Sequence, residues 1–289
     1  MPLPIIVCPA NPPLLRRLAG RTLAPRVKRV DQAAAAAAQV TEAGASLFCV
    51  IVHAAQPMAA LEFPQALKDV PLAIMAPTMG RFRDLAQRLG SLRGFNLRVF
   101  LPCDKPENFV ALRVLSSLGI PSGAVFGADT DWDDLADLMT YAVLGRVPHA
   151  PMDPFSYIVS RYQPASYLNW GASIFDDPTR FLHLDGKGRV ALSEAELRRR
   201  CFVADSLDGI AEADDLPAIG DRAQAWRGFF AENHPCTACP GWKLCLARFA
   251  TGPAAPDRGC AAFFEEMIEV ALRAQALTVA RPEHRTWQA

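Results

Sequence analysis

Short apolar runs alternate with amphipathic segments along the first half of this 289-residue chain. The runs PIIVCP, SLFCVIV, PLAIMAP, FNLRVFLPC and SGAVFG are apolar nearly throughout and have the length of strands. The segments between them, such as PENFVALRVLSSLG, repeat apolar residues every three or four positions, the period of a helix with one buried side. Apolar strands separated by helices are typical of a parallel sheet covered on both faces. Residues 1–145 are therefore predicted to form a β/α domain: a barrel, a partial barrel or an open doubly wound sheet.

Terminal residues support the helices of this half. Asp31 is placed to cap the alanine-rich segment DQAAAAAAQVTEAG, and Gly44 is placed to end it. Pro106 and Gly119 bracket the next clear helix in the same way. Asp131 is expected to cap DWDDLADLMTYAVLG. Because alanine has the highest helix propensity, the alanine run is predicted to be a helix and not a disordered tract.

The pattern changes after residue 145. Residues 146–180 are rich in proline and aromatic side chains and are predicted to be a linker that packs on the rest of the protein. The stretch RFLHLDGKGRVALS alternates around DGKG, which predicts a β-hairpin. The segment GCAAFFEEMIEVALRAQAL predicts a long amphipathic helix. We therefore expect a second, cysteine-containing domain at residues 181–275 and a tail at 276–289.

Composition excludes several classes of partner. The formal net charge is zero, so no global field attracts the protein to nucleic acid or to anionic lipid. No apolar run approaches the ~20 residues that a membrane span requires. The first residues, MPLPIIVCPANPP, lack the basic and apolar regions of a signal peptide. We therefore expect a cytoplasmic protein without a nucleic-acid or membrane partner.

The eight cysteines divide into two groups. Most of the scattered ones lie in apolar runs, where a free cysteine is usually a small core residue. The others are clustered in the spacing C-x2-C-x5-C-x14-C, at Cys236, Cys239, Cys245 and Cys260. In a reducing compartment, clustered cysteines favour a metal site over disulfides.

The spacing of the clustered cysteines favours iron–sulfur chemistry. Three ligands within ten residues and one distant fourth are a common arrangement for a 4Fe–4S cluster. Structural zinc usually takes two close pairs, and Cys245 and Cys260 do not form such a pair. Zinc remains the main alternative, and four unrelated thiols the third.

The second half resembles a known family. HLDGKGRV, FVADSLDGIAEADDLPAI, CTACPGWKLC and the late Cys260 before a helix are similar to the SPASM or twitch extension of radical S-adenosylmethionine (radical SAM) enzymes. The resemblance implies an α/β fold: a partial parallel (β/α) barrel of radical SAM type with a C-terminal SPASM/twitch-like cysteine-rich domain. It also implies one auxiliary 4Fe–4S cluster, carried by Cys236, Cys239, Cys245 and Cys260.

The chain departs from this family at the positions on which radical chemistry depends. The family's catalytic cluster requires C-x3-C-x2-C after the first strand. Cys8 ends that strand here, but Pro12 and Leu15 stand where the other two cysteines belong. Cysteines of the family's other auxiliary cluster are replaced by Ala191, Leu192 and Ser193 and by Arg248 and Phe249. We therefore expect one cluster and no cleavage of S-adenosylmethionine.

These departures lead to a functional hypothesis. We expect a degenerate, non-catalytic iron–sulfur protein that acts as a binding or electron-transfer partner in the maturation of a peptide or protein. Its partner would be a peptide or a protein, with a radical SAM enzyme among the candidates. The alternatives are a redox enzyme that uses its single cluster and a zinc-stapled α/β binding protein. The five histidines show no metal spacing, and His53, at a strand end, is expected to be structural.

Overall fold

A computed structural model describes residues 3–81, 89–127, 129–208, 210, 212, 215–249 and 258–279. Its strands form one ten-stranded sheet in the order β10-β9-β1-β2-β4-β5-β6-β7-β8, with β3 paired to β2. Every pairing is parallel except that of β9 with β10. The strands are β1 (Ile5–Pro9), β2 (Thr22–Val27), β3 (Ser46–Leu47), β4 (Val50–His53), β5 (Leu72–Met75), β6 (Leu97–Pro102), β7 (Ser122–Val125), β8 (Met152–Asp153), β9 (Phe181–Leu184) and β10 (Val190–Ala191).

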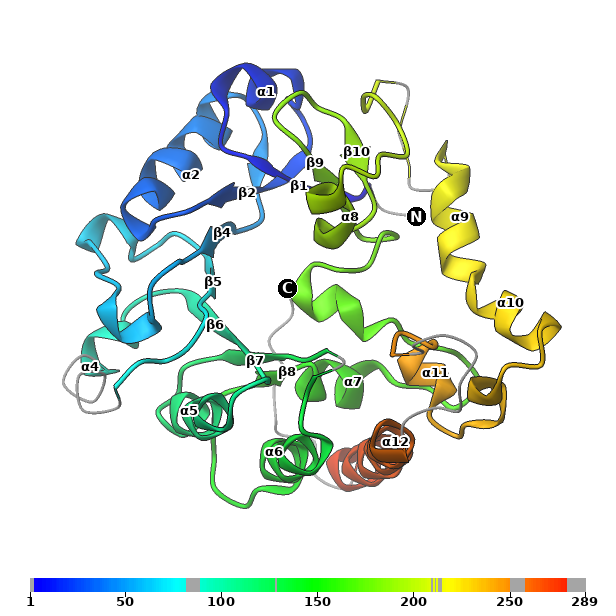
Figure 1. Ribbon diagram of the computed structural model, residues 1–289. Coiled ribbons are helices and arrows are strands. Elements are labelled where there is room, and N and C mark those ends of the chain that lie inside the picture. Colours follow the sequence, from blue (N-terminus) through cyan, green and yellow to red (C-terminus); the bar gives the residue numbers. More distant parts are fainter. Residues whose placement is uncertain are drawn as a thin grey trace.

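The sheet curves into an open arc with helices along its outer side (Figure 1). The protein is therefore an α/β protein whose sheet has the form of a partial barrel, as expected. The helices are α1 (Pro12–Arg17), α2 (Ala33–Glu42), α4 (Leu89–Leu92), α5 (Pro106–Ser117), α6 (Trp132–Leu144), α7 (Phe155–Arg161), α8 (Glu194–Arg199), α9 (Pro217–Gln224), α10 (Trp226–Ala231), α11 (Trp242–Cys245) and α12 (Arg258–Val279). The segment GRFRDLAQRLGSL, residues 80–92, also has the apolar spacing that predicts a helix, and most of it lies outside the described residues.

The helix ends follow from local chemistry, with one correction. The Asp131 carboxylate accepts hydrogen bonds from the amides of Asp133 and Asp134 and caps α6, as predicted. Asp31 does not cap α2, because it lies in a 3-10 turn (Val30–Gln32) before that helix and pairs instead with Arg29. The prediction failed because a short turn precedes the helix and moves its start beyond the reach of Asp31.

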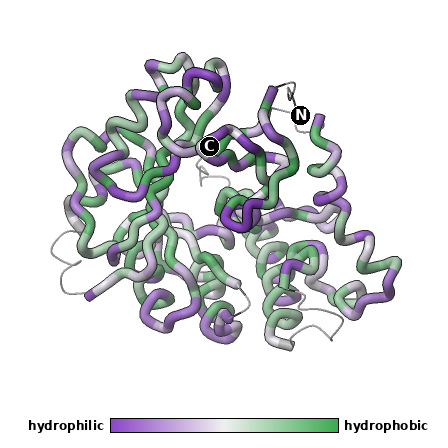
Figure 2. The backbone as a smooth tube through the Cα atoms, turned by 45° about the horizontal axis from the view of Figure 1, so that its top comes forward, coloured by the Kyte–Doolittle hydropathy of each residue, from purple (hydrophilic) through white to green (hydrophobic). Residues whose placement is uncertain are grey.

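The two faces of the arc are both apolar. The outer face packs against the helices, and hydrophobic residues follow the strands in Figure 2. The inner face holds a smaller cluster that includes Val7, Ile51, Phe100 and Phe181. At Gly123, an added Cβ would overlap the ring of Phe100, so the absent side chain leaves the space that this phenylalanine occupies. The interior is thus filled largely by side chains rather than being an open channel.

The hairpin of the second half belongs to the same sheet. β9 pairs in parallel with β1, which places Phe181 beside Ile5 and His183 beside Val7. The segment predicted as a linker also contributes β8, α7 and the buried Trp170. The two predicted halves therefore share one sheet, and the boundary at residue 181 stays a prediction.

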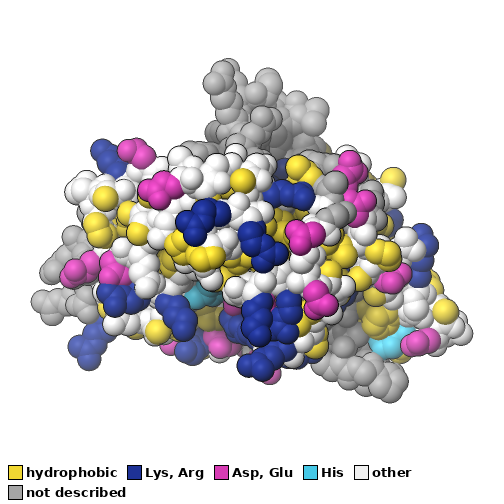
Figure 3. Space-filling model, turned by 90° about the horizontal axis from the view of Figure 1, so that it is seen from above, with side chains coloured by type: hydrophobic (Ala, Val, Ile, Leu, Met, Phe, Trp, Pro, Cys, Tyr) yellow, Lys and Arg dark blue, Asp and Glu magenta, His cyan; other side chains and the backbone are white. Residues whose placement is uncertain are grey.

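The exterior has no dominant charge on the face seen in Figure 3. Basic and acidic side chains are interspersed there with apolar ones, in keeping with the net charge of zero. Within the described part of the chain, no helix combines the length and the hydrophobicity needed to cross a bilayer.

Candidate thiol centre and barrel cavity

The four clustered cysteines lie in or next to a 3-10 turn, at the end of α11 and at the start of α12. Cys236 is in a 3-10 turn (Pro235–Ala238), Cys239 follows it, Cys245 ends α11 and Cys260 lies in the first turn of α12. Cys239 is half-buried and the other three are buried. We call these four side chains the thiol centre.

The four thiols interact with one another. A hydrogen bond links Cys260 to Cys245, and it lowers the pKa of Cys245 while raising that of Cys260. Burial raises the pKa of Cys236, and repulsion from Cys245 and Cys239 raises it further. Cys236 and Cys239 also raise the pKa of Cys260 by repulsion. The structure therefore brings together all four cysteines that the sequence singled out, although fourteen residues separate the last two.

Backbone amides face two of the sulfurs. The Cys245 sulfur accepts hydrogen bonds from the N–H groups of Phe249, Arg248 and Ala247. Leu246 and Ala247 adopt left-handed backbone conformations, with φ of 50° and 57°, which non-glycine residues rarely take. This turn folds the chain back so that its amides meet the sulfur. The arrangement stabilises a thiolate at Cys245, the protonation state in which cysteine binds metal.

Backbone amides also form hydrogen bonds at the first pair of cysteines, Cys236 and Cys239. The Cys239 sulfur accepts hydrogen bonds from the N–H groups of Gly241 and Trp242, which lower its pKa against the larger effect of burial. The His234 Nδ1 accepts a hydrogen bond from the Cys236 amide at 3.1 Å and so fixes the start of the 3-10 turn. His234 therefore uses this ring nitrogen within the turn.

The thiol centre does not have the geometry of a single-ion site. Among the residues that the structure describes, no group of three or more His, Cys, Asp or Glu side chains is set to hold one metal ion. A mononuclear zinc requires four sulfurs about 2.3 Å from one point. A 4Fe–4S cubane binds each thiolate at a different iron, so its ligands stand further apart. Four cysteine thiols are a donor set that both structural zinc sites and 4Fe–4S clusters use, so the identity of the metal stays a prediction.

Aromatic side chains anchor the thiol centre to the barrel. Phe249, four residues after Cys245, stacks on Phe126, the residue that follows β7, with ring centroids 6.0 Å apart. Phe263, three residues after Cys260, packs edge-on against Phe126 at 6.0 Å and tilted against Trp132 at 5.6 Å. The loops that carry the cysteines are thereby held against β7 and α6.

The remaining cysteines are not part of this centre. Cys8, Cys49 and Cys103 are buried, and burial raises the pKa of each to about 12. This agrees with the prediction that they are core residues, and it leaves Cys103 without the lowered pKa that a nucleophile needs. Cys201 is exposed and is not a core residue.

A second feature is a cavity of about 210 Å³ inside the arc. Its walls come from the inner face of the strands, from the segment around Phe175 and from α8. Its polar lining consists of His53, Asp176, His183, Glu194 and Arg198. We call it the barrel cavity. Such a position, where parallel strands end, is the usual place for ligand sites in β/α barrels.

Two neutral histidines face the barrel cavity. His183 is 2 % exposed; its Nε2 lies 2.8 Å from the Phe175 carbonyl oxygen, and its Nδ1 is buried without a hydrogen-bond partner. Burial lowers the pKa of His183 to about 4. The His53 Nε2 lies 3.6 Å from the Glu194 carboxylate, and burial lowers the pKa of His53 as well. Sequence reasoning missed this pair, because only the pairing of β9 with β1 brings His183 to the same interior.

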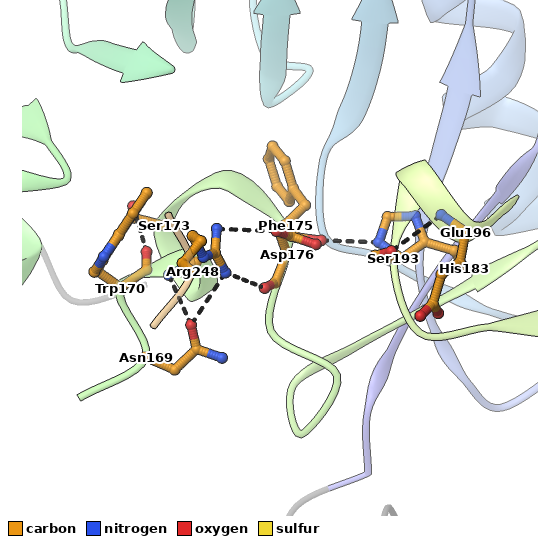
Figure 4. Close-up of polar contacts among 10 residues, drawn as sticks. Asn169, Trp170, Ser173, Phe175, Asp176, His183, Ser193, Glu196 and Arg248 are labelled. Carbon is orange, nitrogen blue, oxygen red and sulfur yellow. Dashed lines mark hydrogen bonds and ion pairs between the residues drawn. The ribbon is translucent and has the colours of Figure 1, made fainter. Parts of the chain in front are cut away.

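Arg248 lies between the two features, and Figure 4 shows its side chain beside Asp176, Asn169 and Trp170. Its amide faces the Cys245 sulfur, and its guanidinium forms a 3.0 Å ion pair with the Asp176 carboxylate. The same guanidinium donates to the Asp176 carbonyl at 3.2 Å and lies 4.6 Å from the centre of the Trp170 ring. Asp176 lines the barrel cavity next to Phe175. Burial raises the pKa of Asp176, and the Arg248 charge opposes that rise.

Comparisons with known proteins assign no family. No protein-family model, curated protein or solved structure matches the chain. The fold and the two sites define it only as an α/β protein with a partial barrel, a four-thiol centre and an internal cavity lined by both apolar and polar side chains.

Proposed function

We propose that the protein is a non-catalytic iron–sulfur protein whose thiol centre binds one 4Fe–4S cluster. It acts as a binding or electron-transfer partner in the maturation of a peptide or protein, and a radical SAM enzyme is a candidate partner. A reducing compartment such as the cytoplasm would keep these thiols available to bind the cluster.

One observation carries the proposal: backbone amides converge on the Cys245 sulfur, next to three other interacting thiols. A bare group of four buried thiolates would be destabilised by mutual repulsion and by desolvation. N–H groups aimed at sulfur stabilise cluster thiolates and tune the reduction potential. A left-handed turn at two non-glycine residues costs free energy. Hydrogen bonds from this turn to a thiolate at Cys245 would offset that cost.

The positions that radical chemistry requires hold other residues. Pro12 and Leu15 lie in α1, directly after β1, and Leu15 is fully buried in the core. Neither side chain can bind iron. The four cysteines of the thiol centre would occupy every iron of a cubane, so no iron is left for a substrate.

A bound cluster would supply one-electron redox chemistry. The protein's own residues hold the thiolates, donate hydrogen bonds to them and limit the access of water. Cys239 is the most accessible of the four cysteines, and Trp242 and the exposed Phe230 pack against each other beside it with ring centroids 5.3 Å apart. In this proposal a protein partner would approach the thiol centre from this edge.

The test is metal and sulfide content after anaerobic purification, together with absorbance near ~400 nm. We expect about four irons and four sulfides per chain and little zinc. Cys245→Ser should lose most of the iron, whereas Cys201→Ser, a change at an exposed cysteine outside the centre, should retain it. Zinc without iron, or iron that survives Cys245→Ser unchanged, would contradict the assignment.

The same preparation tests the absence of radical chemistry. With S-adenosylmethionine and dithionite, we expect no 5′-deoxyadenosine above the level of a protein-free control. Formation of 5′-deoxyadenosine that depends on the protein would show that the chain is a catalyst.

A further inference from the structure

We propose that the barrel cavity binds a free α-amino acid with an apolar side chain about the size of leucine. The side chain would lie against the half-buried walls of the cavity. The ammonium and carboxylate groups would lie beside Glu194 and Arg198 of α8. This inference goes beyond the function proposed above, because none of the residues that carry it is a cysteine of the thiol centre.

The apolar part of the ligand follows from the walls and the volume of the cavity. Its half-buried apolar walls, which keep surface that a ligand can touch, are Met75, Val125, Ile174 and Phe175. An apolar cavity of about 150 Å³ is large enough for benzene. A cavity of about 210 Å³ therefore has room for a branched or straight chain of four carbon atoms and its head group. Burial of this chain would supply the hydrophobic part of the affinity.

The polar part follows from an ion pair of α8. The Arg198 guanidinium donates to the Glu194 Oε1 at 2.5 Å, and both side chains line the cavity. Both are also accessible, since 31 % of the Glu194 side chain and 73 % of the Arg198 side chain are exposed.

This ion pair leaves hydrogen-bonding groups unused. Within the described part of the chain, the Glu194 Oε2 accepts no hydrogen bond, yet it is not a buried atom. The His53 Nε2 lies 3.6 Å from it, beyond the length of a good hydrogen bond. A guanidinium has five N–H groups, and only one of those on Arg198 is directed at Glu194. A ligand can therefore meet a free carboxylate oxygen and free N–H donors side by side.

The presence of both charges on the ligand follows from the balance of charge around the cavity. Arg198 neutralises Glu194, and Arg248 neutralises Asp176, the other lining carboxylate, at 3.0 Å. A ligand with a net charge would disturb this balance, and the Arg26 charge, which acts on Glu194, disfavours an ammonium alone. A zwitterion adds no net charge. Its ammonium can donate to Glu194 while its carboxylate accepts from Arg198.

The α-amino acid follows from the spacing of the two partners. Glu194 and Arg198 are in direct contact, so the two ligand groups that bind them must also be close together. In an α-amino acid, a single carbon atom joins the ammonium nitrogen to the carboxylate carbon. The same carbon carries the side chain, which can then enter the apolar part of the cavity.

Four small molecules test the proposal by ligand-detected NMR titration of the full-length protein at pH 7. L-Leucine is the expected ligand. L-Asparagine has nearly the same shape with a polar side chain, 4-methylpentanoate lacks the ammonium, and 3-methylbutylamine lacks the carboxylate. We expect each of the last three to bind on the order of tenfold more weakly than L-leucine, because each loses either the apolar contact or one charge-assisted pair.

Three variants place the ligand at the ion pair. Arg198→Gln should weaken the binding of L-leucine about tenfold without weakening that of 3-methylbutylamine, which has no carboxylate to lose a partner. Glu194→Gln should weaken the binding of L-leucine without weakening that of 4-methylpentanoate. Arg199→Gln, at an exposed arginine of the same helix outside the cavity lining, is the matched control and should leave all binding unchanged. Thermal melts show whether each variant is folded.

Several outcomes would overturn the proposal. Equal binding of L-leucine and L-asparagine would remove the role of the apolar walls, and tighter binding of 3-methylbutylamine would make this a cation site. Binding of L-leucine that survives both Arg198→Gln and Glu194→Gln would place the ligand elsewhere. No binding of L-leucine at millimolar concentration would remove the amino-acid assignment. Because these readouts are independent of iron content, they separate this inference from the proposed function.

Discussion

The thiol centre and the barrel cavity are built in opposite ways. The thiol centre is largely local: Cys245 meets the amides of the residues that immediately follow it, and Cys236 and Cys239 share one loop. The barrel cavity is assembled from distant segments, since His53 comes from β4 and His183 from β9. The first can be recognised from the spacing of residues, whereas the second exists only once the strands are paired.

The largest expected effect is a loss of folding stability at acid pH, caused by His183 in the barrel cavity. His183 has a pKa of about 4 in the folded protein, below its ordinary value of 6.5. The unfolded chain therefore binds a proton on this residue first as the pH falls, so the full stability present above pH 6.5 is lost progressively down to about pH 4. The loss attributable to His183 is about 3 kcal/mol.

Chemical denaturation at pH 7 and pH 4.5 measures this effect. His183→Gln should lose much less stability between the two pH values than the natural protein loses. If His183→Gln and the natural protein lost the same amount, His183 would not be buried in its neutral form.

Two glycines allow each region to be disturbed separately. An added Cβ would overlap the Phe100 ring at Gly123 and the Phe264 side chain at Gly241. Gly123→Ala and Gly241→Ala should each lower the free energy of unfolding by about 2 kcal/mol through overpacking. Only Gly241→Ala should reduce iron content, because it alone changes the loop of the thiol centre.

Gly127→Ala and Gly228→Ala are the matched controls, since an added Cβ meets no atom within 4 Å at either position. Unfolding curves and iron analysis of the four variants check the comparison. A parallel loss of iron in Gly123→Ala and Gly241→Ala would show that the two regions do not behave separately.

The smallest expected effect is at the connection between the regions. Arg248→Gln should lower the free energy of unfolding by about 1 kcal/mol at neutral pH, because both partners of the ion pair are partly exposed. The pKa of Asp176 should rise, since the Arg248 charge that opposes the effect of burial is lost. The difference from the natural protein should therefore shrink as the pH falls and Asp176 becomes protonated. Carboxyl NMR and unfolding at two pH values test both effects, and an unchanged Asp176 pKa would contradict the contact.

Much of the fold could be predicted from local patterns. The apolar runs marked most of the parallel strands, and Asp131 marked the start of α6, because these signals depend on neighbours in the sequence. The assignment of Asp31 failed because a turn intervenes before α2. The place of β9 beside β1 could not be predicted, since nothing local distinguishes a hairpin that joins a sheet from one that stands apart.

The candidate sites divide in the same way. The spacing of the cysteines drew attention to four thiols that affect one another's pKa in the structure, whereas their role as metal ligands stays a prediction. The left-handed turn at Leu246 and Ala247 could not be predicted from the sequence, because neither residue type favours that conformation. The cavity histidines are too far apart in the sequence to be associated before the strands are paired.

Arg248 also has a consequence for the protein's evolution. The Arg248 backbone donates a hydrogen bond at Cys245, and its side chain forms an ion pair with Asp176. A substitution at Arg248 is therefore expected to affect both sites. Substitutions in contact with a shared partner do not have additive effects. Among homologous sequences, the residues at positions 248 and 176 are therefore expected to change together. Substitutions in the loop of the thiol centre should then be accompanied by substitutions in the cavity segment that contains Asp176.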